Sequence, residues 1–297
     1  MATAHSASPA PRVMWHPAAA LRRHPLIGYF ALTFAFSWLI VIVLGVALRL
    51  PAQVVVALNT IGPTFGAVVM TALLDGRAGL RRLLRSLARW RVGARWYLFA
   101  LLGIPLIYLL GTLALPGVLA DVRPPVPVPW LVEYLIVFVA GGIVGGPLFE
   151  EPGWRGFALP RLQAQLGPLR GTLLLGGLWG AWHLPQYFVP AWAAQNGGLH
   201  PSSVIVYLLV VPAIAVIMTW VYNRTQGSLL LAVLAHASVN TAQPLVVNDP
   251  FPRAASTEVN ALLAFGITAL VLLVLTRGRL GYRGAVDGGP GAGRAGG

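Results

Sequence analysis

Two adjacent glutamates, Glu150 and Glu151, follow the long apolar stretch Trp130–Phe149. Ionisable side chains at membrane depth cost at least about 2.5 kcal/mol, so they pair or face a wet cavity. In a continuous helix Glu151 and Arg155 lie one turn apart and can pair, which leaves Glu150, about 100° further round, free for chemistry. Pro152 leaves this register open, because the residue before a proline disfavours the helical region. The alternative is an ordinary boundary of a membrane span.

Two other apolar stretches carry histidines. His183 lies within Thr172–Val189 and has no charged neighbour in sequence, while His236 and Asn240 lie four residues apart within Leu229–Val247. One helical face therefore presents an imidazole and a carboxamide to the same space. A hydrogen bond between helices explains a single such histidine, whereas three polar stretches together favour a shared cavity.

These side chains supply the groups that peptide-bond hydrolysis needs. A carboxylate or a neutral imidazole takes a proton from water, and a second imidazole with an amide donates hydrogen bonds to the developing oxyanion. Alternatively, His183, His236 and Glu150 bind zinc or another divalent metal, with the remaining carboxylate as the base. The spacing is not the HEXXH pattern of soluble zinc peptidases, so residue types alone support the metal alternative.

The composition indicates that these residues are positioned by membrane-spanning helices. The chain is 57% hydrophobic and 10% charged, with mean hydropathy +0.74, whereas soluble domains carry about 25% charged residues. Only helices satisfy every backbone group in lipid, so the sequence predicts an all-α, polytopic bundle over residues 26–276. Eight stretches are long enough to span a bilayer: Leu26–Leu48, Ala52–Leu74, Trp96–Leu115, Trp130–Phe149, Thr172–Val189, Val204–Tyr222, Leu229–Val247 and Val259–Thr276. The absence of cysteine excludes disulfides, thiolate ligands and a thiol nucleophile.

The net charge of +13 is carried by arginine, which gathers in alternate connections between the apolar stretches. This placement argues against a nucleic-acid partner and is typical of cytoplasmic loops, so both termini are expected in the cytoplasm. We predict a cytoplasmic tail at residues 1–25 and a disordered one at residues 277–297. The stretch Arg77–Arg91 has leucines at helical spacing and is either a surface helix or a simple loop.

Three motifs resemble those of one membrane family. The first motif is two glutamates with an arginine four residues after the second, here Glu150, Glu151 and Arg155. The second is an aromatic residue four before a histidine, here Trp179 and His183. The third is a histidine four before an asparagine, here His236 and Asn240. This pattern is similar to that of the CPBP family, which covers type II CAAX prenyl endopeptidases and bacterial bacteriocin-processing and immunity relatives. The resemblance covers about residues 130–247.

The resemblance implies an intramembrane endopeptidase with a cavity open toward the cytoplasm. Glu150 would correspond to the glutamate that activates water with His183, and His236 with Asn240 to the pair that stabilises the oxyanion. Glu151 and Arg155 would hold the first motif in shape. Family members are described as metalloproteases or as metal-free glutamate proteases, so the cofactor, zinc or none, stays open. We expect an integral protein of the bacterial plasma membrane that cleaves a membrane-associated substrate or a peptide precursor.

Two other classes of function fit the same sequence. Transporters also bind ions with broken helices and charged residues at depth, and a non-catalytic membrane partner or immunity protein needs such residues only to brace its bundle. The predicted spans also place the candidate site residues at different depths in the membrane. The predicted spans place Glu150 at a membrane edge and His183 about 16 Å inside. Either the fourth span continues past Glu150 or the fifth begins later than Thr172.

Overall fold

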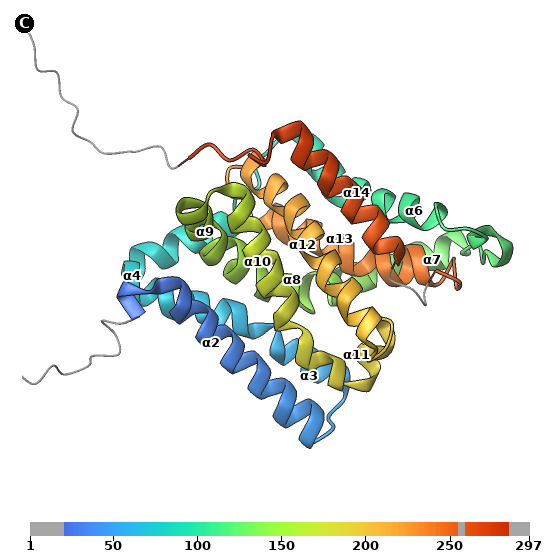
Figure 1. Ribbon diagram of the computed structural model, residues 1–297, viewed down its shortest axis with the longest axis horizontal. Coiled ribbons are helices and arrows are strands. Elements are labelled where there is room, and N and C mark those ends of the chain that lie inside the picture. Colours follow the sequence, from blue (N-terminus) through green and yellow to red (C-terminus); the bar gives the residue numbers. More distant parts are fainter. Residues whose placement is uncertain (1–20, 255–258, 285–297) are drawn as a thin grey trace, which may run out of the picture.

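The structure is a computed structural model that describes residues 21–254 and 259–284. The predicted N-terminal tail therefore lies outside the described residues up to position 20. Within the described ranges the chain is helical and contains no strand, which confirms the predicted all-α bundle (Figure 1). The longer helices, in chain order, are α2 (Pro25–Ile40), α4 (Ile61–Leu87), α6 (Ile104–Leu113), α7 (Pro127–Val137), α10 (Pro168–Trp182), α12 (Pro201–Arg224), α13 (Leu229–Ala242) and α14 (Val259–Thr276).

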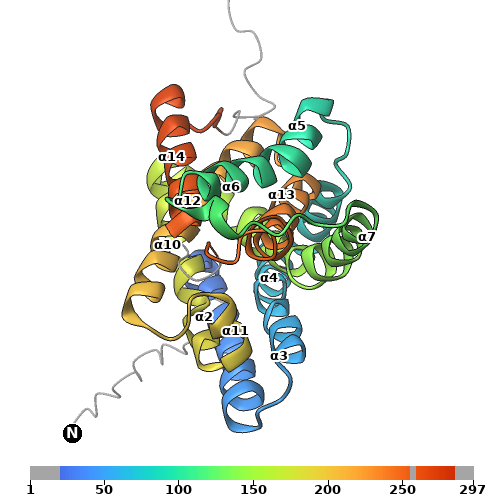
Figure 2. The ribbon, with the colours of Figure 1, turned by 90° about the vertical axis from the view of Figure 1, so that its right-hand side faces the viewer.

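Shorter helices join and extend these. They are η1 (Val41–Ala47), α3 (Ala52–Asn59), α5 (Ala94–Leu98), η2 (Phe99–Gly103), η3 (Val118–Asp121), η4 (Phe138–Val144), α8 (Pro147–Glu151), η5 (Pro152–Ala158), α9 (Leu159–Leu166), η6 (Leu184–Phe188), α11 (Pro190–Gln195) and η7 (Gln243–Asn248). In the bundle α12 packs between α10 and α14, and α2 packs along α4. Figure 2 shows α2, α3 and α11 together at one end of the molecule.

Seven helical stretches in the described residues are long and apolar enough to cross a membrane. The predicted fifth span, Thr172–Val189, is the exception. There α10 ends at Trp182 after 15 residues, about 22 Å of helix against a hydrocarbon core of about 30 Å. The short helices η6 and α11 then lead to α12, so this part of the bundle is a broken helix.

The fourth stretch runs from Pro127 to Leu166, over 40 residues. It therefore continues well past Glu150, which is the first of the two alternatives that would allow a shared site. Its helical course is interrupted at Gly145 and Gly146, where the chain turns before Pro147 starts α8. The catalytic candidates of the first motif thus lie inside the bundle.

The arginine-rich connections lie at one end of the bundle. The Arg89 guanidinium donates to the carbonyl of Gln226, and the Ser228 hydroxyl donates to the carbonyl of Arg89 at 2.6 Å. These contacts join the connection after α4 to the one between α12 and α13. A separate group of connections meets where the Arg123 amide donates to the carbonyl of Pro250 at 2.9 Å.

Two basic segments differ from simple loops and tails. Helix α4 extends to Leu87 with one break at Gly76 (φ 57°, ψ −150°), so the arginine-rich stretch that follows the second span is helical up to that point. Residues 277–284 of the predicted disordered tail pack on the bundle, because Leu280 is fully buried and its carbonyl accepts from Asn223 at 3.0 Å. The rest of that tail, 285–297, lies outside the described residues.

Candidate active site

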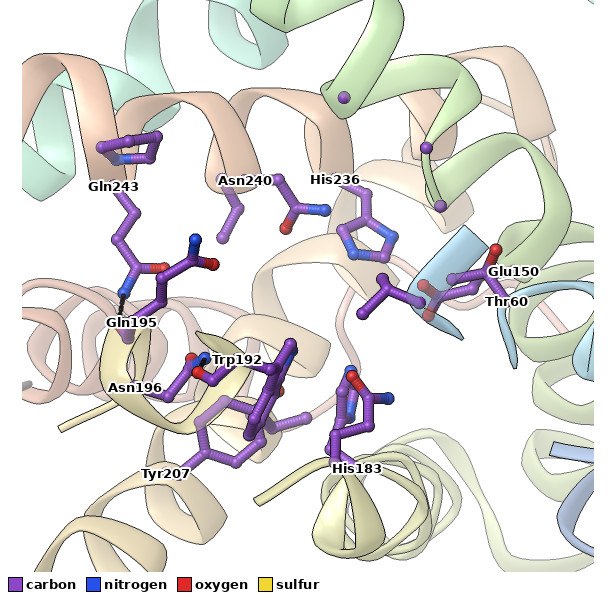
Figure 3. Close-up of a pocket in the computed structure, with 18 of the residues that line it drawn as sticks. Thr60, Glu150, His183, Trp192, Gln195, Asn196, Tyr207, His236, Asn240 and Gln243 are labelled. Carbon is purple, nitrogen blue, oxygen red and sulfur yellow. Dashed lines mark hydrogen bonds between the residues drawn. The ribbon is translucent and has the colours of Figure 1, made fainter. Parts of the chain in front are cut away.

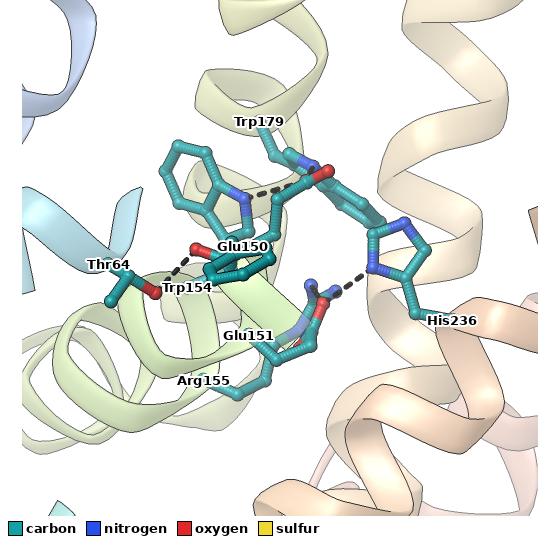
Figure 4. Close-up of polar contacts among 8 residues, drawn as sticks. Thr64, Glu150, Glu151, Trp154, Arg155, Trp179 and His236 are labelled. Carbon is teal, nitrogen blue, oxygen red and sulfur yellow. Dashed lines mark hydrogen bonds and ion pairs between the residues drawn. The ribbon is translucent and has the colours of Figure 1, made fainter. Parts of the chain in front are cut away.

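Glu150 projects from α8, directly after the break in the fourth helical stretch. Pro147 starts this helix without an amide donor to lose, and the Glu150 amide donates to the Gly146 carbonyl at 3.0 Å. The Glu150 Oε2 accepts from the indole Nε1 of Trp154 at 3.2 Å and of Trp179 at 3.0 Å (Figure 4). Its side chain is buried. One carboxylate oxygen is therefore held by two indoles, while the residue still borders a cavity.

Glu151 is the centre of a buried ionic group. Its Oε1 accepts from Arg155 Nη1 at 2.9 Å and from His236 Nδ1 at 2.9 Å (Figure 4). The side chains of Glu151 and Arg155 are both fully buried. The helix continues through Pro152 with helical torsions (φ −57°, ψ −31°), so the predicted pairing one turn apart is confirmed. The contact to His236 comes from α13, 85 residues later.

Trp179 contacts both Glu150 and Arg155. Its Nε1 binds Glu150, and the Arg155 guanidinium carbon lies 4.4 Å from its ring centroid. Such a cation–π contact stabilises a desolvated guanidinium by about 1–2 kcal/mol. The aromatic residue of the second motif therefore contacts the first motif twice, Glu150 through its indole N–H and Arg155 through the face of its ring.

His183 lies at the end of α10, where its Nδ1 is 2.9 Å from the Trp179 carbonyl. This contact assigns the proton to Nδ1 and leaves Nε2 as an acceptor in the neutral ring. Trp192 of α11 stacks against the imidazole, with ring centroids 6.0 Å apart. The broken fifth stretch is thus what brings His183 beside the other motifs.

A cavity of about 670 Å³ collects four of the predicted residues, Glu150, His183, His236 and Asn240 (Figure 3). Asn240 is exposed to this space, one turn beyond the buried His236. Glu151 and Arg155 do not border the cavity and lie behind it. The six predicted site residues therefore divide into four that face the cavity and two that support them.

Several residues of the site were not predicted. Trp154 follows Glu150 by four residues, and this helical spacing was a readable signal for its contact. The cavity is also bordered by aromatic and amide side chains around α11, with no spacing that would have indicated them: Gln186, Trp192, Gln195, Asn196 and Tyr207.

The predicted metal ligands were Glu150, His183 and His236. In the part of the chain that the structure describes, no three histidine, aspartate or glutamate side chains are grouped to hold a metal ion. Indole donors contact Glu150 Oε2, whereas the contacts of both histidines involve Nδ1 and leave each Nε2 free. The described residues therefore show no preformed three-ligand set, and the cofactor stays a prediction.

Fold and site together define a polytopic helical membrane protein with a carboxylate and two imidazoles around one cavity. Residues 129–242 match the family model described as type II CAAX prenyl endopeptidase Rce1-like. The chain is also similar to a protein named CAAX prenyl protease 2 from Methanococcus maripaludis, with 29% identity over 122 residues, 40% of this chain and 44% of that relative. The chain therefore matches less than half the length of this relative. Both findings support a CPBP-family assignment over the region that they cover.

Proposed function

We propose that the protein is an intramembrane endopeptidase. The observation that carries this proposal is the convergence of Glu150, His183, His236 and Asn240 on one cavity from three separate parts of the chain. Peptide hydrolysis needs a base for water and donors for an oxyanion, and this set contains both. The similarity of residues 129–242 to the Rce1-like family model supports the same reaction class.

In the proposed mechanism Glu150 and His183 take a proton from water. The resulting hydroxide adds to the carbonyl carbon of the scissile peptide bond, and His236 and Asn240 donate to the oxyanion. When the C–N bond breaks, the proton returns to the leaving nitrogen, so that one water is added across the bond. Two indole donors on Oε2 keep the Glu150 carboxylate in a fixed orientation for this step.

Glu151 positions His236 in this mechanism. Its carboxylate accepts from His236 Nδ1, so a second N–H, on Nε2, requires the imidazolium form. A carboxylate partner stabilises that cation, as it does in hydrolytic triads. Arg155 in turn balances the charge of Glu151 inside the bundle. The proposed oxyanion donor thus depends on two residues that do not border the cavity.

The proposed substrate is a peptide segment at the membrane, either in a membrane-associated protein or in a peptide precursor. A peptide that carries a prenylated cysteine is one such substrate, and the name of the similar methanococcal protein suggests it. The arginine-rich connections at one end of the bundle support a cytoplasmic location for that end and for both termini. A bacterial plasma membrane remains the expected location.

The test is cleavage of a fluorogenic peptide pool, with prenylated and unprenylated members, by purified protein in lipid. Glu150→Gln should lower the rate by at least about 10²-fold, the usual contribution of a general base. Glu133→Gln is the matched control, since it makes the same change at an exposed position of α7 in the same helical stretch. A folded wild type that cleaves nothing would contradict the proposal. Loss of cleavage with a chelator, restored by zinc, would show a metal requirement.

A further inference from the structure

A second pocket, of about 340 Å³, lies at the arginine-rich end of the bundle. Three arginines from distant parts of the chain border it: Arg95 at the start of α5, Arg224 at the end of α12, and Arg283 in the segment after α14. Its volume is within the range of pockets that bind small ligands, about 300–1,000 Å³. None of these arginines belongs to the cavity described above.

One wall of this pocket is the C-terminal segment, which is fixed in place. Leu280 is fully buried, and its carbonyl accepts from the Asn223 amide at 3.0 Å. Gly281 then lies against Arg224, since a Cβ at position 281 would be 2.9 Å from the Arg224 Cδ and Nε. Its positive φ of 72° also favours glycine. The segment therefore packs against Arg224 at Gly281, and Arg283 borders the same pocket.

The opposite wall is the turn between α12 and α13. Gln226 (φ 56°) and Gly227 (φ 78°) form this turn, and Arg89 and Ser228 tie it to the connection after α4. The pocket thus has walls from separate segments, and each segment is held by hydrogen bonds to other parts of the chain.

The charge of the pocket is not balanced within the described protein. No carboxylate there pairs with Arg95, Arg224 or Arg283, whereas Asp75 on the same side of the bundle already pairs with Arg82 and Arg161. Guanidinium groups bind phosphate oxygens with charge-assisted, often bidentate hydrogen bonds. Three arginines that line one pocket therefore favour a phosphate group as the ligand.

The position of the pocket relative to the membrane-spanning helices indicates which class of molecule carries this phosphate. Arg95 and Arg224 lie at the ends of two candidate membrane spans, and Arg283 follows a third. Span ends lie at the headgroups, where basic pockets between helices bind anionic lipids. Exposed Trp90, with the Arg91 guanidinium carbon 5.1 Å from its ring centroid, is the kind of residue that gathers at this level.

We propose that this pocket, formed by Arg95, Arg224 and Arg283, binds the phosphate of an anionic phospholipid headgroup. Retention of positive charge on cytoplasmic loops explains why arginines occur at this end. It does not explain why three of them meet in one pocket, with a glycine packed on the stem of Arg224. The site is independent of the proposed peptidase reaction.

The test measures binding of dioctanoylphosphatidylglycerol to the full protein in neutral detergent, by calorimetry. One variant carries Arg95→Gln, Arg224→Gln and Arg283→Gln. Its matched control carries Arg77→Gln, Arg81→Gln and Arg85→Gln, which removes the same charge from exposed positions of α4 outside the pocket. Dioctanoylphosphatidylcholine and inorganic phosphate are the comparison ligands.

Each arginine at the headgroup level contributes about fivefold in affinity, so the pocket variant should bind on the order of a hundredfold more weakly. The control variant should stay within about twofold of wild type, because exposed charges that do not line the pocket are screened by salt. Arg283→Gln alone, in an exposed segment, should cost about fivefold without any effect on folding. Equal losses in both triple variants would overturn the site, and equal binding of inorganic phosphate would overturn its assignment to lipid.

Discussion

The two adjacent glutamates should respond differently to the same substitution. Glu151→Gln removes the carboxylate that accepts from Arg155 and His236, each at 2.9 Å. The Arg155 guanidinium then stays fully buried with no opposite charge beside it. We therefore predict that Glu151→Gln destabilises the bundle strongly, whereas Glu150→Gln leaves its stability nearly intact.

The size of this difference follows from the buried pair. Removing one partner of a buried ion pair costs about 3–5 kcal/mol, since it leaves an uncompensated charge in the interior. For a chain of this size each kcal/mol lowers the melting temperature by about 2–4 °C, so Glu151→Gln should lower it by about 6–20 °C. Glu150 accepts only from indoles, and its amide isostere still accepts from Trp154 and Trp179.

The assay is thermal unfolding in detergent, followed by the fluorescence of the 10 tryptophans and by loss of monodisperse protein. The double variant Glu151→Gln with Arg155→Met should recover part of the loss, because replacing a buried pair by apolar groups is often nearly neutral. Equal melting temperatures for Glu151→Gln and wild type would refute the reasoning, as would a double variant less stable than the sum of the two single changes.

Three further substitutions test the site and the packing behind it. Asn240→Ala should lower the cleavage rate by about 10²–10³-fold if its amide is an oxyanion donor, with an unchanged melting temperature since the side chain is exposed to the cavity. Trp179→Phe removes one indole donor to Glu150 and should reduce the free energy of unfolding by about 1.5–3 kcal/mol, as judged by denaturant titration. Gly142→Ala places a Cβ 2.7 Å from Thr241 Oγ1 and should destabilise by about 1–3 kcal/mol. Its control Gly177→Ala, with no atom within 4 Å of the new Cβ, should not.

Local spacing in the sequence was enough to predict part of the site. The pair of Glu151 and Arg155 and the shared helical face of His236 and Asn240 both follow from residues four apart, which meet on any helix. The same rule would have revealed Trp154 as a partner of Glu150.

Contacts between distant segments could not be predicted in this way. The bond from His236 to Glu151 crosses 85 residues and that from Trp179 to Glu150 crosses 29. Both depend on how α8, α10 and α13 pack, which hydropathy does not encode. The predicted fifth span likewise included His183 because its neighbours in sequence are apolar, although α10 ends at Trp182. Hydropathy reports which residues tolerate lipid, and a broken helix inside a bundle has the same composition as a spanning one.

The order of residues in the first motif explains how one helix serves both chemistry and structure. Neighbouring residues point about 100° apart on a helix, so Glu150 can face the cavity while Glu151 faces the interior between η5 and α13. Each glutamate then meets its own partner four residues on, Trp154 for the first and Arg155 for the second. Because Pro152 keeps helical torsions, both pairs form side by side. If the helix were rotated by one residue, Glu151 would face the cavity and Glu150 would face the interior. Glu150 would then be buried without a cation beside it, and the ion pair of Glu151 and Arg155 would be exposed to the cavity.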